Sequence, residues 1–76
     1  MFNHSTQIQQ KRLLEYLQIT GPLSTLQARQ ELDICHPAAR VMELRAQGHN
    51  IVTELIVEND HHRVAKYFLL PGNNHV

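Results

Sequence analysis

Gly48 separates two stretches of this sequence whose apolar residues follow different periods. Before it, apolar residues recur three or four positions apart, which is the spacing of helices that bury one side. After it, residues 51–58 (IVTELIVE) and 64–70 (VAKYFLL) are rich in β-branched and aromatic residues, which is typical of strands. Glycine ends helices readily because it adopts the left-handed backbone conformation without steric cost. The sequence therefore predicts an α+β fold in which three helices precede two strands.

The first predicted helix begins near Thr6, because Gln9 stands three positions later in a capping-box spacing. It is expected to end near Thr20, where Gly21 and Pro22 favour a turn. The apolar spacing within this segment defines the side that would face the core. The residues expected on that side are Ile8, Leu13, Leu14 and Leu17.

A second helix is predicted to follow this turn at once. Ser24 and Gln27 repeat the capping-box spacing, and the helix is expected to run through Leu32. Asp33 then occupies a turn position that needs a residue tolerating positive φ, and Ile34 offers an apolar anchor beneath that turn. The candidates for burial in this helix are Leu26, Ala28 and Leu32.

The third predicted helix lies in ICHPAARVMELRAQGHN, residues 34–50. Pro37 lacks an amide hydrogen and has a preset φ, which suits the first helical position, so His36 or Cys35 is expected to be the N-cap. The inner side is expected to contain Val41 and Leu44, with Ala38 and the aliphatic part of Arg45. The residues expected on the outer side are His36, Ala39, Arg40, Glu43 and Gln47.

The two strands are expected to form a hairpin whose polar loop runs from Glu58 to Arg63. An isolated hairpin is marginal in water, so this one must pack on the helices. The residues chosen for its inner face are Ile51, Leu55, Val57, Tyr67 and Leu69. We expect one domain over residues 6–70, with a disordered N-terminus (1–5) and a disordered C-terminal tail (71–76).

The composition restricts the class of protein. Seven Lys+Arg balance seven Asp+Glu, and this zero net charge counts against nucleic-acid binding, although six histidines soften the objection. The single Cys35 excludes an intramolecular disulfide and suits a reducing compartment. The N-terminal residues lack the apolar run of a signal peptide, and no stretch approaches the roughly 20 apolar residues of a membrane span. We therefore expect a cytoplasmic location and no membrane partner.

Within this layout, LSTLQARQELDICHPAARVMELRAQGHNIVTE, followed by RVAKYFLL, resembles the small winged helix-turn-helix domains of bacterial and phage proteins. The similarity covers roughly residues 8–70. It implies a three-helix bundle followed by a C-terminal β-hairpin, and it implies binding to double-stranded DNA. The segment from about 36 to 47 would be the recognition helix and the 58–63 loop would be the wing. Such a protein is expected to be a small transcriptional regulator.

DNA recognition combines base-edge contacts with phosphate contacts. Arg40 is the first choice for base readout, because its planar fork can pair with guanine O6 and N7. The full set of expected base readers is His36, Ala39, Arg40, Glu43 and Gln47. The residues expected at phosphates or in the wing are Ser24, Thr25, Gln27, Arg29, His61, His62, Arg63 and Lys66.

Other functions remain open at this stage. The neutral charge favours a protein-interaction module in which the same surface, or a strand edge, docks another chain, and a homodimer or a fused partner protein is possible. If Arg29, Arg40, Arg63 and Lys66 converge on one face, DNA binding is favoured over interaction.

Asp60, His61 and His62 suggest a metal, but no third convergent ligand is apparent, so no cofactor, metal or small-molecule ligand is predicted. The sequence also shows no clustered nucleophile and base that could form an active site, so a chain of this size is not expected to be an enzyme.

Overall fold

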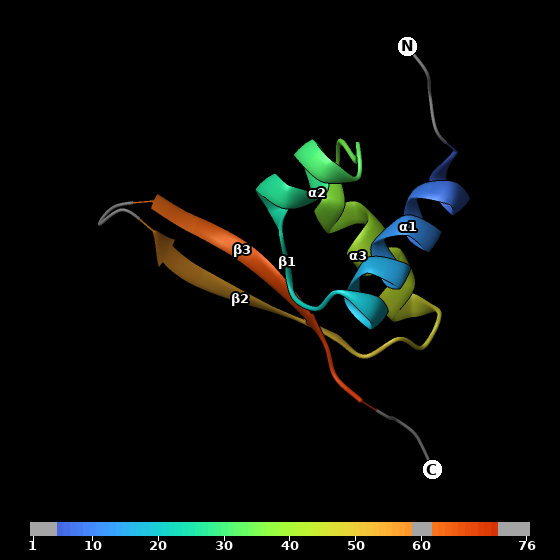
Figure 1. Ribbon diagram of the computed structural model, residues 1–76. Helices are drawn as coiled ribbons and strands as arrows, with labels where there is room; N and C mark the ends of the chain where they lie inside the picture. The colour runs from blue at the N-terminus through green and yellow to red at the C-terminus, as the bar shows by residue number, and fades with distance from the viewer. Residues whose placement is uncertain (1–4, 59–61, 72–76) are drawn as a thin grey trace.

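The computed structural model describes residues 5–58 and 62–71, apart from the side chains of residues 58 and 62. Three helices gather on one side of the molecule, and a long hairpin extends away from them (Figure 1). The predicted α+β order is confirmed. The predictions made for residues 1–4, 59–61 and 72–76 lie outside the described residues. The elements in chain order are α1 (Thr6–Ile19), β1 (Leu23–Ser24), α2 (Thr25–Glu31), α3 (Pro37–Ala46), β2 (Ile51–Glu58) and β3 (His62–Leu69).

The three strands form an antiparallel sheet in the order β1-β3-β2. In the hairpin, Ile51 is opposite Leu69 and Glu54 is opposite Lys66. The two-residue strand β1 pairs Leu23 with Tyr67, on the other side of β3. This short strand was not predicted from the sequence, because two residues are too few to show a period. Its pairing attaches the segment between α1 and α2 to the sheet and leaves β2 as an edge strand.

The helix ends follow the predicted turn chemistry, with one shift. Ser5, not Thr6, is the N-cap of α1, since its Oγ accepts a hydrogen bond from the Ile8 amide at 3.2 Å. The capping box of Ser24 and Gln27 is confirmed at the start of α2. At the end of α1, Gly21 has φ 125° and so adopts the positive φ that glycine tolerates best. These ends fix the lengths of α1 and α2.

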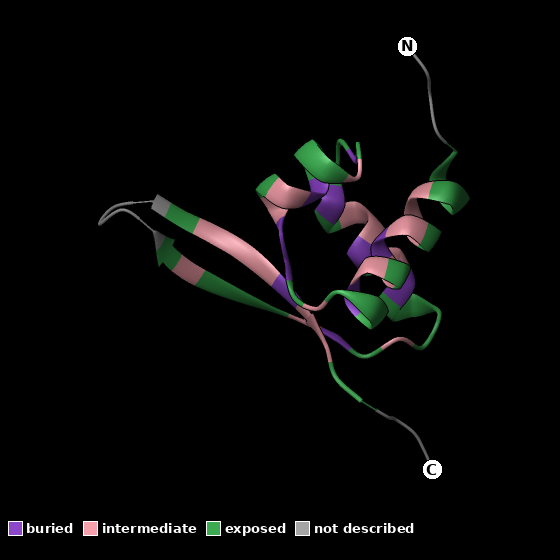
Figure 2. Ribbon diagram, viewed as in Figure 1, coloured by how far each residue is buried: buried purple, intermediate pink, exposed green. Residues whose placement is uncertain are grey.

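The core lies between the helices and the base of the hairpin, where the buried stretches of all three helices and of the strands meet (Figure 2). Its buried hydrophobic residues are Leu13, Leu17, Leu23, Ala28, Ile34, Val41, Leu44, Ile51 and Tyr67. Three inward predictions within the hairpin and α2 are wrong: Leu55 is 66% exposed, Val57 61% and Leu26 52%. Leu55 and Val57 alternate in phase with Ile51, but the hairpin extends beyond the helices that cover its base (Figure 1). Burial therefore ends before the strands do.

Membrane crossing by a helix is not supported by the described residues. None of their helices combines the length and the apolar character that a bilayer requires.

Candidate nucleic-acid interface

A tight turn joins α2 to α3. The amides of Leu32 and Ile34 both donate to the carbonyl of Ala28, each at 3.1 Å, and Asp33 between them has φ 57°. The predicted positive-φ position is thus confirmed at Asp33. Ile34 is fully buried beneath the turn, as predicted. Because Ile34 anchors the connection in the core, the direction in which α3 leaves α2 is fixed by packing.

The orientation of α3 is set by three buried residues, Pro37, Val41 and Leu44. Pro37 occupies the first helical position and His36 is the N-cap, as predicted, although no side-chain hydrogen bond caps this end. The residues of α3 that face solvent, on the side away from these three, differ from the predicted set. Those exposed on α3 are Ala38, Met42, Arg45 and Ala46. The prediction that Ala38 points inward is wrong.

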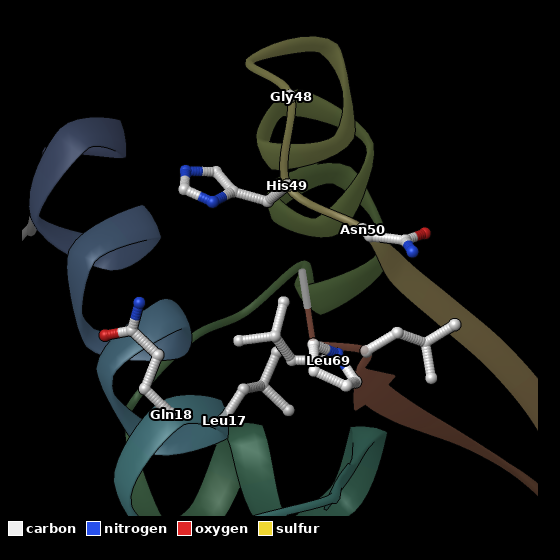
Figure 3. Close-up of a pocket in the computed structure, with 8 residues that line it drawn as sticks. Leu17, Gln18, Gly48, His49, Asn50 and Leu69 are labelled. Atoms are coloured by element: carbon white, nitrogen blue, oxygen red, sulfur yellow. The ribbon is translucent and has the colours of Figure 1, made fainter. Parts of the chain in front are cut away.

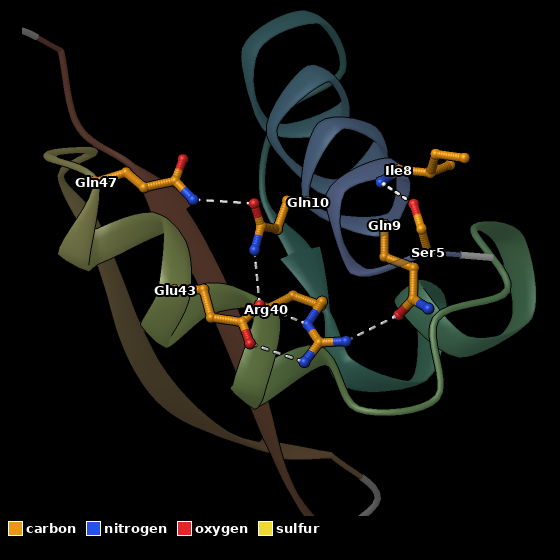
Figure 4. Close-up of polar contacts among 7 residues, drawn as sticks. All are labelled: Ser5, Ile8, Gln9, Gln10, Arg40, Glu43 and Gln47. Carbon is orange, nitrogen blue, oxygen red and sulfur yellow. Dashed lines mark hydrogen bonds and ion pairs between the residues drawn. The ribbon is translucent and has the colours of Figure 1, made fainter.

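Arg40 is not on the free side of α3. Its side chain is only 15% exposed and faces α1 (Figure 4). Nη2 donates to Glu43 Oε2 at 2.9 Å and Nη1 donates to Gln9 Oε1 at 3.4 Å. Nε lies 2.8 Å from Glu43 Oε1 as an ion pair, although its orientation is not that of a hydrogen bond. The prediction that Arg40 lies on the exposed side of α3 is therefore wrong, because α1 covers it.

Two further residues of the predicted base-reading set join the same network. Gln10 on α1 donates to Glu43 Oε1 at 2.8 Å, and Gln47 donates to Gln10 Oε1 at 2.9 Å (Figure 4). Glu43 is half-buried, and Gln47 is exposed but uses its amide to reach α1. We name Gln9, Gln10, Arg40, Glu43 and Gln47 the α1–α3 clasp. This clasp holds the recognition-helix candidate against the first helix.

The Glu43 carboxylate is stabilised in its charged form. The hydrogen bond from Gln10 is the main cause that lowers its pKa below the ordinary glutamate value, and Arg40 adds a hydrogen bond and an attractive charge. Desolvation opposes this shift in the pKa without reversing it. Glu43 is therefore an ionised acceptor within the clasp at neutral pH, and its free acceptor capacity for a base is reduced.

Arg45 is exposed, yet it also has a structural role. Its Nε donates to the carbonyl oxygen of Ile51 at 2.6 Å, and its Nη2 donates to Thr53 Oγ1 at 2.7 Å. These contacts attach the last turn of α3 to the first residues of β2. The prediction that the aliphatic part of Arg45 is buried with Val41 is not supported, because the residue is exposed.

A groove of about 360 Å³ lies between α2 and β3. Arg29, from α2, and Arg63, from β3, both line it, and both are exposed. Arg29 also donates from Nε to the carbonyl of Cys35 at 3.3 Å, which places it beside the turn that leads into α3. No carboxylate is present among the six described residues of the lining. We name it the arginine groove, and its lining is Thr25, Leu26, Arg29, Arg63, Val64 and Ala65.

The four positively charged residues Arg29, Arg40, Arg63 and Lys66 do not share one face. Arg29 and Arg63 share the arginine groove, and Lys66 lines an adjoining hollow that also contains Leu26. Arg40 is on the α1 side of α3 instead. Three of the four side chains therefore lie around Leu26, between α2 and β3.

The remaining residues predicted to contact phosphates either have partners within the protein, are exposed, or lie outside the described residues. Ser24 is buried, its Oγ accepting from the Gln27 amide and its own amide donating to Gln27 Oε1, at 3.0 Å each. Thr25 Oγ1 donates to the carbonyl of Ala65 at 3.4 Å. On α3, Ala39 is half-buried and the N-cap His36 is exposed. Neither His61 nor the side chain of His62 is among the described parts of the chain.

Another hollow, of about 410 Å³, lies at the opposite end of the hairpin from its tip, between α1 and the chain after Gly48 (Figure 3). Gln18, His49, Asn50 and Leu69 are among its lining residues. The described residues contain no group of three or more His, Cys, Asp or Glu side chains placed to hold a metal ion. We see no catalytic arrangement in this hollow, since His49 is the only titratable side chain among its described lining residues.

Sequence reasoning missed Met42 and Ala38 as exposed members of α3. The signal was present: if Pro37 and Val41 define the buried side at four-residue spacing, residues 38 and 42 fall one position beyond it, away from Arg40. The spacing of the apolar residues alone allows two orientations of α3, one with Arg40 exposed and one with Arg45 exposed, because both residues are polar. The contact with α1 selects between them.

Comparison with known proteins agrees with this architecture. A family model described as the winged helix-turn-helix domain matches residues 8–71. No curated protein and no solved structure matches the chain. The winged helix-turn-helix is a DNA-binding fold, and in this chain α2, the turn and α3 have the order of a helix-turn-helix and are followed by the β2–β3 hairpin. With a match that spans most of its length, the chain belongs to the winged helix-turn-helix domain family.

Proposed function

We propose that this protein binds double-stranded DNA, with the exposed side of α3 in the major groove and the arginine groove against the phosphate backbone. The major groove admits an α-helix, and the helix that follows the turn is the one that enters it in this fold. The side of α3 available for that contact begins at His36 and includes Ala38 and Met42. This set replaces Arg40, Glu43 and Gln47 as the residues proposed to face the bases.

The arginine groove is the observation that carries the proposal. Arg29 and Arg63 lie far apart in the sequence but line one hollow beside the α2–α3 turn, with no carboxylate among its described lining residues. Phosphate contacts position a protein on DNA, and exposed arginines are well suited to them. The zero net charge of the chain is thus compatible with DNA binding, because the local distribution of charge decides attraction at this distance.

The proposed base-facing residues favour particular chemistry. Ala38 and Met42 offer methyl and thioether groups, which pack against thymine methyls, whereas the N-cap His36 supplies a polar ring near the helix start. Because Arg40 contacts α1 and Glu43, few hydrogen-bond donors remain on this side of α3. We therefore propose that phosphate contacts supply most of the affinity, and that sequence preference is modest for one domain. The finer proposal, a small bacterial or phage transcriptional regulator, rests on the family resemblance.

The test is a titration of a short mixed-sequence duplex over a series of salt concentrations. Arg29→Ala and Arg63→Ala are each expected to weaken binding and to reduce the slope of log K against log salt by about 0.9, the value for one lost phosphate contact. Lys11→Ala removes the same charge from α1, away from the arginine groove, and is the matched control. If binding ignores salt, or if Lys11→Ala weakens it equally, the proposal is wrong.

A protein-interaction module is the second candidate function. It is favoured by large apolar side chains left in solvent: Met42 and Leu55 are each 66% exposed. Amide shifts recorded in the titration separate the two functions, since DNA binding perturbs residues 25–29, 36–46 and 63–66. Absence of any shift with DNA favours interaction.

A further inference from the structure

The strand β2 has one side of its backbone unpartnered. In the sheet order β1-β3-β2, β3 is central and β1 covers only two residues of its far side, so β2 is the long edge. An open edge presents N–H and C=O groups that can pair with another strand.

The hydrogen bonds between β2 and β3 show which backbone groups of β2 point outward. The Leu70 amide donates to the carbonyl of Asn50 at 2.9 Å, so residue 50 is a hydrogen-bonded position with respect to β3. In an antiparallel pair these positions alternate, which assigns residues 52, 54 and 56 to β3 and directs 51, 53, 55 and 57 outward. The contact of Arg45 confirms the phase, because it reaches the Ile51 carbonyl from the open side. By this alternation the amides and carbonyls of residues 53, 55 and 57 point away from β3, and the side chains of these residues are exposed.

The open edge of β2 has few of the usual protections of an edge strand. Its sequence, IVTELIVE, contains no proline or lysine, its charged residues are Glu54 and Glu58, and Arg45 contacts this edge only at the Ile51 carbonyl and the Thr53 hydroxyl. Leu55 and Val57 are 66% and 61% exposed on this strand. Both the backbone and the side chains therefore fit another extended segment better than they fit water.

We propose that β2 pairs antiparallel with β2 of a second copy of this chain, about a two-fold axis through Leu55. In that register Leu55 lies opposite Leu55 of the second copy, and Thr53 lies opposite its Val57. All three outward positions, 53, 55 and 57, then meet outward positions, so the pairing satisfies each of these amides and carbonyls. A register shifted by one residue would place outward groups opposite inward ones.

The side chains in this register are compatible on both faces. On the face shared with the core, Ala65 and Leu55 of each copy form a continuous apolar row, since Leu55 is opposite Ala65 within the hairpin. On the other face, Glu54 would lie opposite Ile56 of the second copy, and its own Lys66 is opposite it in β3. No like charges are directly opposed in this register, so it avoids the destabilisation that such pairs cause. A neutral chain also carries no net repulsion against its own copy.

Amide hydrogen exchange on the wild-type protein provides the direct test, without DNA, so its outcome does not depend on the proposed function. As concentration rises, the amides of residues 53, 55 and 57 are expected to gain protection, whereas those of 52, 54 and 56 are already protected by β3. A sample of mixed isotope labelling is expected to show an intermolecular contact between the α protons of Glu54 and Ile56. Protection that rises equally along β2, or not at all, overturns the proposal.

Sedimentation equilibrium of two variants tests the same contact. Leu55→Lys places two like charges opposite each other and is expected to raise the dimer dissociation constant by at least about tenfold. Ile19→Lys is the matched control, because Ile19 is 81% exposed on α1 and distant in sequence from the edge, and it is expected to leave association unchanged. Circular dichroism verifies that both variants keep the fold. A monomer at every concentration, or equal weakening by both variants, overturns the proposal.

Discussion

At the scale of single residues, Arg40 shows how a side chain with the chemistry of a base reader becomes a structural one. Its guanidinium meets Glu43 on its own helix and Gln9 on α1, and α1 leaves it only 15% exposed. Arg29 is a contrasting case, because it stays exposed while one nitrogen holds the turn before α3. The sequence predicts a DNA contact for both residues, at a base for Arg40 and at a phosphate for Arg29. Their surroundings separate those roles.

The clasp predicts a pH dependence of stability. The pKa of Glu43 is lowered in the folded protein, so its contribution is present above the unfolded pKa of about 4.3 and is lost as the pH falls through the lower folded value. Glu43→Gln is expected to flatten the pH dependence of the unfolding free energy below about pH 5, measured by urea denaturation. Glu15→Gln, on the exposed side of α1, is the control. An unchanged profile for Glu43→Gln would contradict the clasp.

At the scale of elements, the helix starts carry much of the local order. The α2 helix has only seven residues, and its start is closed by two reciprocal hydrogen bonds between Ser24 and Gln27. Isolated helices this short are unstable in water, so capping and packing together hold α2 in place. The capping box could be predicted from the sequence because its partners are three residues apart. The start of α1 was displaced by one residue because Ser5 and Thr6 are both good N-caps.

Removal of the caps tests this directly. Ser24→Ala is expected to lower the unfolding free energy by about 1 kcal/mol, or by roughly 4–8 °C in Tm for a domain of this size. Thr6→Ala is expected to have little effect, because the cap of α1 is Ser5. Thermal unfolding followed by circular dichroism distinguishes the two variants. A larger loss for Thr6→Ala would show that the cap is misassigned.

At the scale of the whole molecule, the core is confined to the helices and the base of the hairpin (Figure 2). Ile34 is fully buried under the α2–α3 turn, whereas Val57 is 61% exposed on the outer part of the hairpin. The exposed outer hairpin is available for DNA or for another chain because it contributes little to the core.

This difference in burial predicts that shortening a side chain in the core lowers the unfolding free energy more than shortening one on the outer hairpin. Ile34→Ala is expected to destabilise the domain by about 2–5 kcal/mol, a large share of the total for a chain of this length. Val57→Ala is expected to change it by less than about 0.5 kcal/mol, as is usual for surface positions. Urea denaturation at a concentration low enough to keep the chain monomeric measures both. Comparable losses would place the outer hairpin in the core.

The sequence by itself determined the order of the three helices and the two hairpin strands, the α2 capping box, the positive φ at Asp33 and the start of α3 at Pro37. These features depend on residues a few positions apart, and their causes are local backbone sterics and hydrogen bonds. Only the tertiary structure decided which polar side of α3 is free, since α1 covers Arg40 and leaves Met42 exposed. It also decided where burial along the hairpin ends, because strand alternation defines a face but says nothing of how far the helices extend over it.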